Sequence, residues 1–384
     1  MRLPVETWDV LVVGAGPAGS CAAAESARLG AKTLLIDAKS RIGEQPHCGE
    51  YVPSKLFGQL KMDRSAIVQP VHIMETIIVD SWDEARQEFC GPTSMTDTMR
   101  RRTQTPSPGY IIDRVRFDRD LARRAASCGA IVMSGTRLVK KEESGWLLQS
   151  GNHEVVLRTK YVIAADGALS CVARTVGMKR PEVLIGAQVE VPLVKSDTRT
   201  YVFLHRNLTD GYGWVFPKGS VANVGIGVSR RRNTSPHSAL GEFLEYLQAI
   251  DLVKPGWLSR SGGVIPVSGL RKSLVNGNIL FCGDAAGLTH AITGAGIPQA
   301  VISGTLAGRT VAEALADETA SPLKKYEAAV KEHYAAVLNH ALSKREHMVR
   351  RWHDPDFATI CHESWIAFEG YRRRVRSQQV RAAK

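Results

Sequence analysis

The sequence has no apolar run long enough to cross a membrane. None of its hydrophobic stretches reaches the roughly 18 to 20 residues that a spanning helix needs. Its first ten residues, MRLPVETWDV, also lack the basic-then-apolar pattern of a signal peptide. From these absences we expect a cytoplasmic protein, with attachment to the periphery of a membrane left open.

Paired cysteines and internal repeats are also missing. The seven cysteines are scattered, without a CxxC pair, at positions 21, 48, 90, 128, 171, 282 and 361. This spacing argues against zinc, so we expect no metal site and reduced thiols. No repeat of about 20 to 50 residues is visible, which excludes a solenoid. The 384 residues, 44% hydrophobic and 23% charged, have a globular composition and suggest two to three domains.

Acidic residues are the scarcer charged type. The chain has 50 Lys and Arg against 38 Asp and Glu, a formal net charge of +12. Such a surplus suits an acidic protein partner or an anionic membrane surface. We expect no nucleic-acid partner, because no aromatic residues are interleaved with the basic runs on a recognised binding fold. These runs are three arginine triplets, at 100–102, 230–232 and 372–374, the last of which lies in a basic tail at 371–384.

The first forty residues predict a dinucleotide site. They read as strand, glycine turn, helix and strand, at 9–13, 14–19, 20–29 and 32–36. In Gly14-x-Gly16-x-x-Gly19, the first glycine permits the tight turn, the second lets a pyrophosphate approach, and the third lets helix and strand pack closely. The helix N-terminus favours that anion, and Asp37 can accept hydrogen bonds from an adenosine ribose. The residues expected to bind the ADP half are Gly14, Gly16, Pro17, Ala18, Gly19 and Asp37.

Two later motifs indicate that the predicted dinucleotide is FAD. One follows a buried-strand pattern and reads ADGALSxxxR at 165–174; the other reads GDAAG at 283–287, with TGAG at 293–296 ahead of a long helix. Asp284 can accept a ribityl hydroxyl, while Gly294 and Gly296 let the backbone lie against an isoalloxazine ring. The helix that follows would direct its positive end at a reduced, anionic flavin.

With these motifs the sequence resembles the FAD-dependent oxidoreductases of the p-hydroxybenzoate-hydroxylase superfamily. Within that group it is most similar to the geranylgeranyl-reductase-like branch. The resemblance extends from about residue 8 to 345. It rests on GAGPAGS (14–20), CGE (48–50), DRVRFD (113–118), ADGALS (165–170), GYGWVFPKG (211–219), ANVGIG (222–227) and GDAAGLTHAITGAGI (283–297). CGE and GYGWVFPKG are the motifs most specific to this branch.

The expected fold is α/β with an α+β substrate part. We expect a Rossmann-like FAD-binding domain from residues 1–66, 110–182 and 276–322. An antiparallel-sheet substrate domain, from 67–109 and 183–275, is interleaved with it. A C-terminal helical region with the basic tail completes the chain at 323–384. Residues 92–109, rich in Pro, Ser and Thr, are interpreted as a mobile loop.

The resemblance also implies roles for particular residues. Arg114 would reach the cofactor from its helix, and Asp166 and Gly167 would face FAD and a transient NAD(P)H. The ring would lie on Gly294, Ala295, Gly296 and Ile297. No second GxGxxG follows a strand, which suits a nicotinamide that visits without its own domain. Relatives often carry proline in place of Ala291, a departure that bears on how the ring is positioned.

Two reactions fit such a flavoprotein. The favoured one is a monooxygenase that traps O2 as a C4a-hydroperoxide and hydroxylates an aromatic or peptide-borne indole or phenol; relatives include enzymes that hydroxylate a protein tryptophan in quinone-cofactor biogenesis. The alternative is hydride transfer to an isoprenoid lipid C=C bond. A non-catalytic or tRNA-modifying flavoprotein is a third possibility. The aromatic residues Trp365, Phe368 and Tyr371 and the arginine-rich end favour hydroxylation of a bulky or protein substrate.

Six residues are candidates for the reaction site. Catalytic candidates are Cys48, Glu50 and His290, and pocket candidates are Tyr212, Trp214 and Phe216. Cys48 is more often a small packed residue than a reactive one, and Glu50 could equally cap a helix that starts at Pro53 or exchange a proton. Tyr212 and Trp214 alternate on a strand, so they share one face, as core or as pocket wall.

Overall fold

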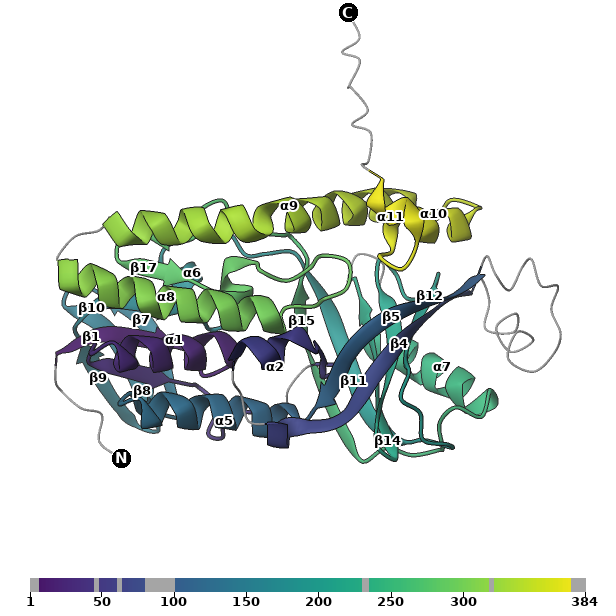
Figure 1. The fold of residues 1–384 in the computed structure, drawn as a ribbon, viewed down its shortest axis with the longest axis horizontal. Helices are drawn as coiled ribbons and strands as arrows, with labels where there is room; N and C mark the ends of the chain where they lie inside the picture. The colour runs from purple at the N-terminus through teal and green to yellow at the C-terminus, as the bar shows by residue number, and fades with distance from the viewer. Residues whose placement is uncertain are drawn as a thin grey trace, which may run out of the picture.

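The computed structural model describes residues 7–44, 48–60, 64–79, 101–229, 235–317 and 321–373. Two sheets lie side by side, and long helices run across one side of them (Figure 1). The expected α/β architecture with an added antiparallel sheet and C-terminal helices is confirmed. Residues 80–100, the triplet 230–232 and the tail from 374 onwards lie outside the described residues.

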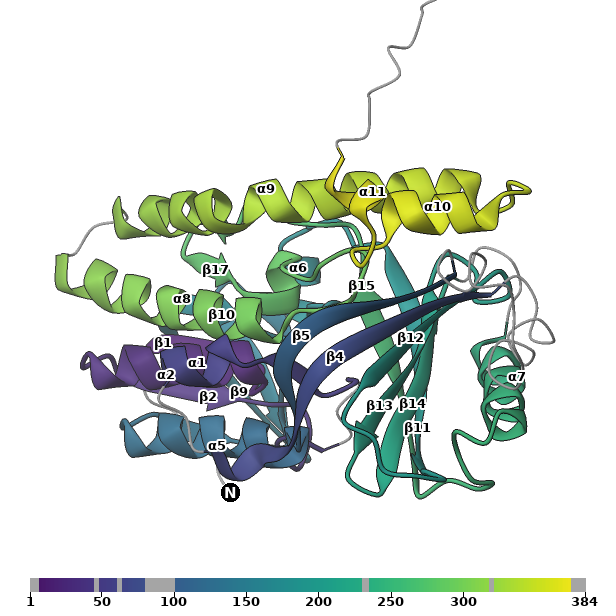
Figure 2. The same cartoon turned by 45° about the vertical axis from the view of Figure 1, so that its right-hand side comes forward.

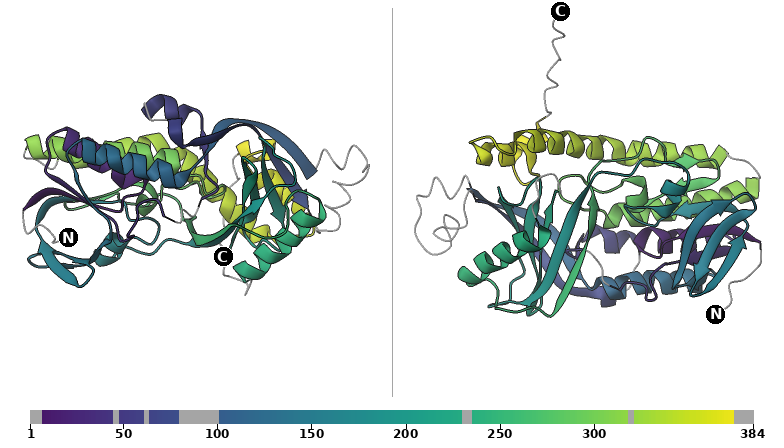
Figure 3. Two further views of the ribbon diagram at one scale, coloured as in Figure 1. Left: turned by 90° about the horizontal axis from the view of Figure 1, so that it is seen from below. Right: turned by 180° about the vertical axis from the view of Figure 1, so that it is seen from behind.

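The first sheet is a Rossmann-like sheet around β1. Its strand order is β16-β17-β10-β1-β2-β6, parallel except for β16. The strands are β1 (Trp8–Val13), β2 (Thr33–Ile36), β6 (Ile131–Met133), β10 (Thr159–Ala164), β16 (Val275–Asn276) and β17 (Ile279–Phe281). Helices α1 (Pro17–Arg28), α5 (Arg114–Ser127) and α8 (Ile297–Asp317) cover one face. A small sheet of β7 (Thr136–Glu142), β8 (Gly145–Ser150) and β9 (His153–Leu157) covers the other (Figure 3).

The second sheet has eight strands in the order β15-β11-β14-β13-β12-β4-β5-β3. They are β3 (Tyr51–Pro53), β4 (Ile67–Val79), β5 (Arg102–Ile112), β11 (Val183–Pro192), β12 (Thr200–His205), β13 (Tyr212–Lys218), β14 (Val221–Val228) and β15 (Ser259–Pro266). Neighbours are antiparallel except β12 and β4, which are parallel. Helix α7 (Pro236–Ala249) packs on one face (Figure 2). The short helices are α2 (Lys55–Leu60) and α6 (Cys171–Thr175).

The C-terminal helices cover the other face of this sheet. They are α9 (Ser321–Arg351), α10 (Phe357–Ser364) and α11 (Glu369–Arg372). Buried Trp352 and Trp365 belong to a core that includes Val202 of β12 and Trp214 of β13. No helix of the described ranges combines the length and apolarity that a membrane span requires.

One expectation about the second sheet was wrong. Residues 102–109 form most of β5 and pair with β4, so they are not part of a loop. Proline is tolerated in this strand because Pro106 lies opposite a register irregularity between Val71 and Ile73 of β4. The strand β3 and the end of β5 also belong to this sheet, whereas the sequence division placed 51–53 and 110–112 with the FAD-binding part.

Helices α1 and α8 touch backbone to backbone, which requires glycine. A Cβ at Gly304 would come within 2.0 Å of the Ala18 carbonyl oxygen, and one at Gly308 within 2.2 Å of the Ala22 oxygen. Rigid backbone cannot move aside as a flexible side chain would. These two glycines therefore set the distance between the helix that starts at the glycine turn and the helix that follows TGAG.

We predict that Gly304→Ala lowers the free energy of unfolding by about 1 to 3 kcal/mol, because the added methyl forces α1 and α8 apart. The matched control is Gly241→Ala in α7, where a Cβ meets nothing within 4 Å. That change should raise stability by about 0.5 to 1 kcal/mol through helix propensity. Urea unfolding followed by circular dichroism measures both, and an unchanged or more stable Gly304→Ala protein would contradict the close contact.

Candidate flavin site and substrate pocket

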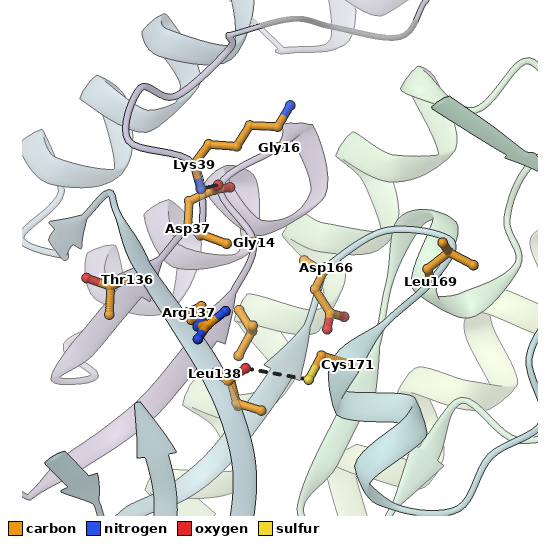
Figure 4. Close-up of a pocket in the computed structure, with 13 residues that line it drawn as sticks. Gly14, Gly16, Asp37, Lys39, Thr136, Arg137, Leu138, Asp166, Leu169 and Cys171 are labelled. Carbon is orange, nitrogen blue, oxygen red and sulfur yellow. Dashed lines mark hydrogen bonds between the residues drawn. The ribbon is translucent and has the colours of Figure 1, made fainter. Parts of the chain in front are cut away.

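A nucleotide-sized cleft opens at the carboxyl ends of β1, β2 and β10. It has a volume of 330 Å³, and residues from the glycine turn, Asp37 and Asp166 line it (Figure 4). Gly14 has φ +99°, and a Cβ there would lie 2.4 Å from the Ala165 carbonyl oxygen. At Gly16, by contrast, a Cβ would meet nothing within 4 Å. The backbone of Gly16 thus borders open space, which is the cradle that a pyrophosphate requires.

The rest of the glycine motif is packed rather than open. A Cβ at Gly19 would overlap the Gly14 carbonyl oxygen, at 1.8 Å. Pro17 and Ala18 form the first turn of α1, and Ala18 is buried. Asp37 accepts hydrogen bonds from the amides of Ala15 at 2.7 Å and Lys39 at 2.8 Å. The Asp37 carboxylate therefore fixes the turn while it lines the cleft where a ribose would lie.

Asp166 lines the same cleft and fixes the start of α6. Its carboxylate accepts hydrogen bonds from Ser170 Oγ at 2.5 Å and from the Val172 amide at 3.0 Å. Burial raises the pKa of Asp166. Gly167 follows with φ +78°, a conformation that suits glycine. Of these two residues, Asp166 lines the cleft that Gly14 and Gly16 form, and Gly167 does not.

The loop before α8 is arranged for the flavin half of the cofactor. Asp284 is partly buried, and within the described residues its carboxylate accepts one hydrogen bond, from Thr289 Oγ1 at 2.7 Å. Burial raises the pKa of Asp284, and the positive charge of Arg114 opposes that rise. A carboxylate with unused acceptor capacity suits a polyol hydroxyl.

The same loop presents backbone to the region where the ring is expected. Gly294 has φ +68°, and Ala295 and Gly296 lead directly into α8 at Ile297. The first turn of this 21-residue helix has no acidic residue. Its free N–H groups and positive dipole end therefore suit a reduced, anionic flavin. The residues at the cleft and in this loop are of the kinds that FAD requires: a glycine turn with Asp37, and Asp284 with a helix N-terminus at Ile297.

Arg114 connects the start of α5 to this site. Its guanidinium makes a bidentate pair with Asp118, with Nε and Nη2 at 3.0 and 2.9 Å from the carboxylate. It also lies beside Cys48 and lowers the pKa of that thiol against the larger rise caused by burial. The Arg114 amide donates to Glu50 Oε1 at 2.9 Å.

A second cavity, of 210 Å³, lies between the large sheet and the loop before α8. Its walls are mostly apolar or aromatic side chains: Cys48, Glu50, Tyr51, Met74, Val202, Tyr212, Trp214, Phe216, Ile265, Thr293, Trp365 and Ile366, with backbone of Gly49, Gly294 and Ala295. All three expected pocket residues of β13 line it. We call it the substrate pocket.

Aromatic residues hold the pocket to the neighbouring loop. Tyr212 donates its hydroxyl to the Thr293 carbonyl oxygen at 2.5 Å, and Trp214 Nε1 donates to Gln188 at 2.9 Å. The rings of Tyr212 and Trp365 are 4.9 Å apart. Trp365 comes from the C-terminal aromatic segment that the sequence singled out. Met74, Val202 and Ile265 were missed, because ordinary apolar strand residues give no signal that they face a cavity.

Glu50 is buried, and three donors from different elements surround its carboxylate. Besides the Arg114 amide, Lys218 Nζ lies at 2.7 Å and Asn223 Nδ2 at 2.6 Å. Glu50 has φ +67°, and its own amide donates to Cys48 Sγ at 3.2 Å. Helix α2 starts at Lys55, so Glu50 does not cap it. These contacts tie the Glu50 side chain to α5, β13 and β14, and its amide to the Cys48 thiol.

His290 does not line the substrate pocket. Its Nδ1 lies 3.3 Å from the Thr293 amide, and its Nε2 lies 3.0 Å from the Tyr371 hydroxyl. Burial, with a contribution from His340, lowers the pKa of His290 to about 4, so the ring is neutral near pH 7. His290 thus joins the loop before α8 to the C-terminal segment. In the part of the chain that the structure describes, no three metal-ligating side chains gather.

We predict that Gly16→Val yields a folded protein that is purified without yellow flavin, since the new side chain fills the cradle. Gly16 has φ −73°, which valine adopts readily, so the thermal unfolding midpoint should hardly differ from that of wild type stripped of FAD. FAD titration should show binding weakened by about tenfold or more, the effect of roughly 1.4 kcal/mol. A yellow variant with one FAD per chain would contradict the placement of the pyrophosphate.

Comparisons with known proteins agree with this site. Residues 7–341 match the family model described as an FAD binding domain. The chain is 36% identical to a digeranylgeranylglycerophospholipid reductase of Methanocaldococcus jannaschii, with 88% of this chain and 86% of the relative covered. A solved geranylgeranyl bacteriochlorophyll reductase-like protein of Thermoplasma acidophilum matches with a TM-score of 0.78 and 29% identity, over 95% of this chain and 92% of that one.

More distant structures share the fold alone. The flavin-dependent brominase Bmp2 matches with a TM-score of 0.70 at 16% identity, over 96% of this chain and 98% of that chain. The match over residues 7–341 spans both sheets and α8. The resemblance that the motifs indicated is confirmed. The chain belongs to the FAD binding domain family, as an FAD-dependent oxidoreductase of its geranylgeranyl-reductase-like branch.

Proposed function

We propose that this protein reduces C=C bonds in the isoprenoid chains of a lipid. The observation that carries this proposal is the substrate pocket, whose apolar wall lies against the loop at Thr293–Ala295 where the flavin ring is expected. An isoprenoid chain has only apolar surface to bury, and such a wall suits it. The names of the similar reductases from Methanocaldococcus jannaschii and Thermoplasma acidophilum agree with this substrate class.

The polar groups of the pocket already have hydrogen-bond partners within the protein. This favours an apolar substrate over a phenol or an indole. A hydroxyl or ring N–H in a closed site needs a partner there. Yet Glu50 already accepts from three donors, and the Tyr212 hydroxyl and Trp214 Nε1 donate to protein oxygens. The comparisons also support the reductase alternative more than the hydroxylase that the sequence favoured. NAD(P)H remains the proposed source of electrons.

Reduction of a C=C bond consumes a hydride and a proton. Bound, reduced FAD would supply the hydride to one carbon, and the other carbon then takes a proton. Cys48 is the candidate donor, because its thiol lines the pocket and burial raises its pKa, which keeps it protonated near pH 7. Glu50 would hold the Cys48 loop in place through its amide, and His290 would position the ring loop.

The test is to mix anaerobic, dithionite-reduced protein with a digeranylgeranylglycerophospholipid in detergent. We expect flavin reoxidation that depends on the lipid, and a lipid product that gains two hydrogens for each bond reduced in its mass spectrum. The control repeats the mixing with air and with phenol or tryptophan peptides. A substrate that gains one oxygen, while the lipid stays unchanged, would favour the hydroxylase instead.

We predict that Cys48→Ala lowers the rate of lipid reduction by about 10² or more, the usual contribution of a positioned acid. FAD binding should be unchanged, because the thiol lies in the substrate pocket and not in the nucleotide cleft. Cys48→Ser should recover little of the rate, since a hydroxyl is a weaker acid than a thiol. Equal rates for wild type and Cys48→Ala would assign the proton to another donor.

A further inference from the structure

The substrate pocket opens to solvent beside the C-terminal segment that contains Trp365 and Ile366. Among the side chains that line the pocket, Ile366 stands out because 40% of its surface is exposed. It lies in the turn between α10 and α11, one residue after buried Trp365. The exposed backbone at Ala295 belongs to the loop where the flavin ring is expected, so the cofactor would cover that opening. The mouth left for a substrate is therefore at Ile366.

The pocket is too small for a whole prenyl lipid. Its 210 Å³ is below the roughly 300 to 1,000 Å³ of pockets that enclose a drug-sized ligand. A lipid with two long chains and a polar headgroup is larger than such ligands. One stretch of one chain can occupy the pocket while the remainder stays outside the mouth. That remainder is apolar and needs a nonaqueous environment.

The surface beside the mouth is basic. Arg372 and Arg373 are exposed, six and seven residues after Ile366. In the sequence from 365 to 384, Glu369 is the one acidic residue, against five arginines and one lysine. The nearby Glu363 is neutralised by Arg351, with a distance of 2.7 Å, and is also bound by His347. Within the described part of this segment, residues 365–373, two exposed arginines thus outnumber one glutamate.

This segment is held rigidly to the body of the protein. Lys344 of α9 donates to the carbonyl oxygens of Glu363 and Gly370, both at 2.7 Å. His340 Nε2 lies 2.6 Å from the Tyr371 carbonyl oxygen, and the Tyr371 hydroxyl reaches His290. The exposed side chains are therefore presented in a fixed arrangement around the mouth, directly connected to the loop before α8.

We propose that residues 365–373, the rim segment, dock on the surface of an anionic bilayer. Ile366 would enter the apolar layer while Arg372 and Arg373 contact lipid phosphates, a combination typical of interfacial binding. A prenyl chain could then pass from the bilayer into the pocket without crossing water. This last step rests on the proposed function; the docking itself does not.

The test uses full-length, FAD-loaded protein and sedimentation with vesicles. Vesicles of phosphatidylcholine mixed with phosphatidylglycerol should bind the protein at low salt, and binding should fall at high salt. Vesicles of phosphatidylcholine alone should bind weakly. Arg372→Glu with Arg373→Glu should weaken binding to the mixed vesicles by roughly fivefold or more for each arginine, and Ile366→Ser should weaken it further.

The matched control is Lys324→Glu with Lys325→Glu, which changes the net charge equally. These exposed lysines lie near the start of α9, at the end of the helix away from α10 (Figure 1). The control should bind vesicles nearly as wild type does. Equal losses in both double variants, or no loss in the rim variant, would overturn the docking site; so would absence of binding to the mixed vesicles.

A second readout separates docking from catalysis. If the proposed function holds, the Arg372→Glu with Arg373→Glu variant should lose reduction of a lipid embedded in vesicles but keep reduction of the same lipid in detergent. Equal activity of wild type and rim variants on vesicle lipid would contradict the route from the bilayer. Protein that binds mixed vesicles through the rim but reduces no lipid would overturn the proposed function and leave the docking site standing.

Discussion

The buried carboxylate of Glu50 is the constraint on which the junction of the two sheets depends. Its donors come from the start of α5, from β13 and from β14, so one anion fixes three elements. The left-handed backbone at Glu50 costs about 1 to 2 kcal/mol, which these hydrogen bonds offset. Removing one partner of such a buried pair typically costs about 3 to 5 kcal/mol. The backbone geometry beside Cys48 is thus stabilised by hydrogen bonds that the Glu50 carboxylate makes outside the pocket.

This arrangement also separates the residues that hold the site together, Glu50 and His290, from the candidate proton donor Cys48. The Glu50 carboxylate accepts from three protein donors, while its amide donates to the Cys48 thiol, whose pKa is raised by burial. His290 is similar, since both ring nitrogens have partners and burial keeps the ring neutral. The polar groups of the site therefore hydrogen-bond to other protein groups and hold the two walls of the pocket together. The space between these walls remains apolar.

The sequence could predict a feature where the interacting residues lie close together along the chain, and could not where they lie far apart. The glycine turn and the shared face of Tyr212 and Trp214 depend on neighbours a few residues apart, and both predictions agree with the structure. The strand at 102–112 was missed because its pairing with β4 overrides a proline-rich local composition. The partners of Glu50 were beyond reach for the same reason, since Lys218 and Asn223 are 168 and 173 residues away.

The fold itself does not choose the reaction, because a brominase with 16% identity shares it. In this protein the cavity beside the loop where the flavin ring is expected has walls from β13 and from the C-terminal segment. A hydroxylase or halogenase must admit oxygen and hold a polar aromatic ring. This wall offers Trp365, Ile366 and Val202, and its tyrosine and tryptophan donors are already used. The C-terminal segment thus adds apolar surface to the pocket through Trp365 and Ile366, which agrees with the isoprenoid substrate that we propose.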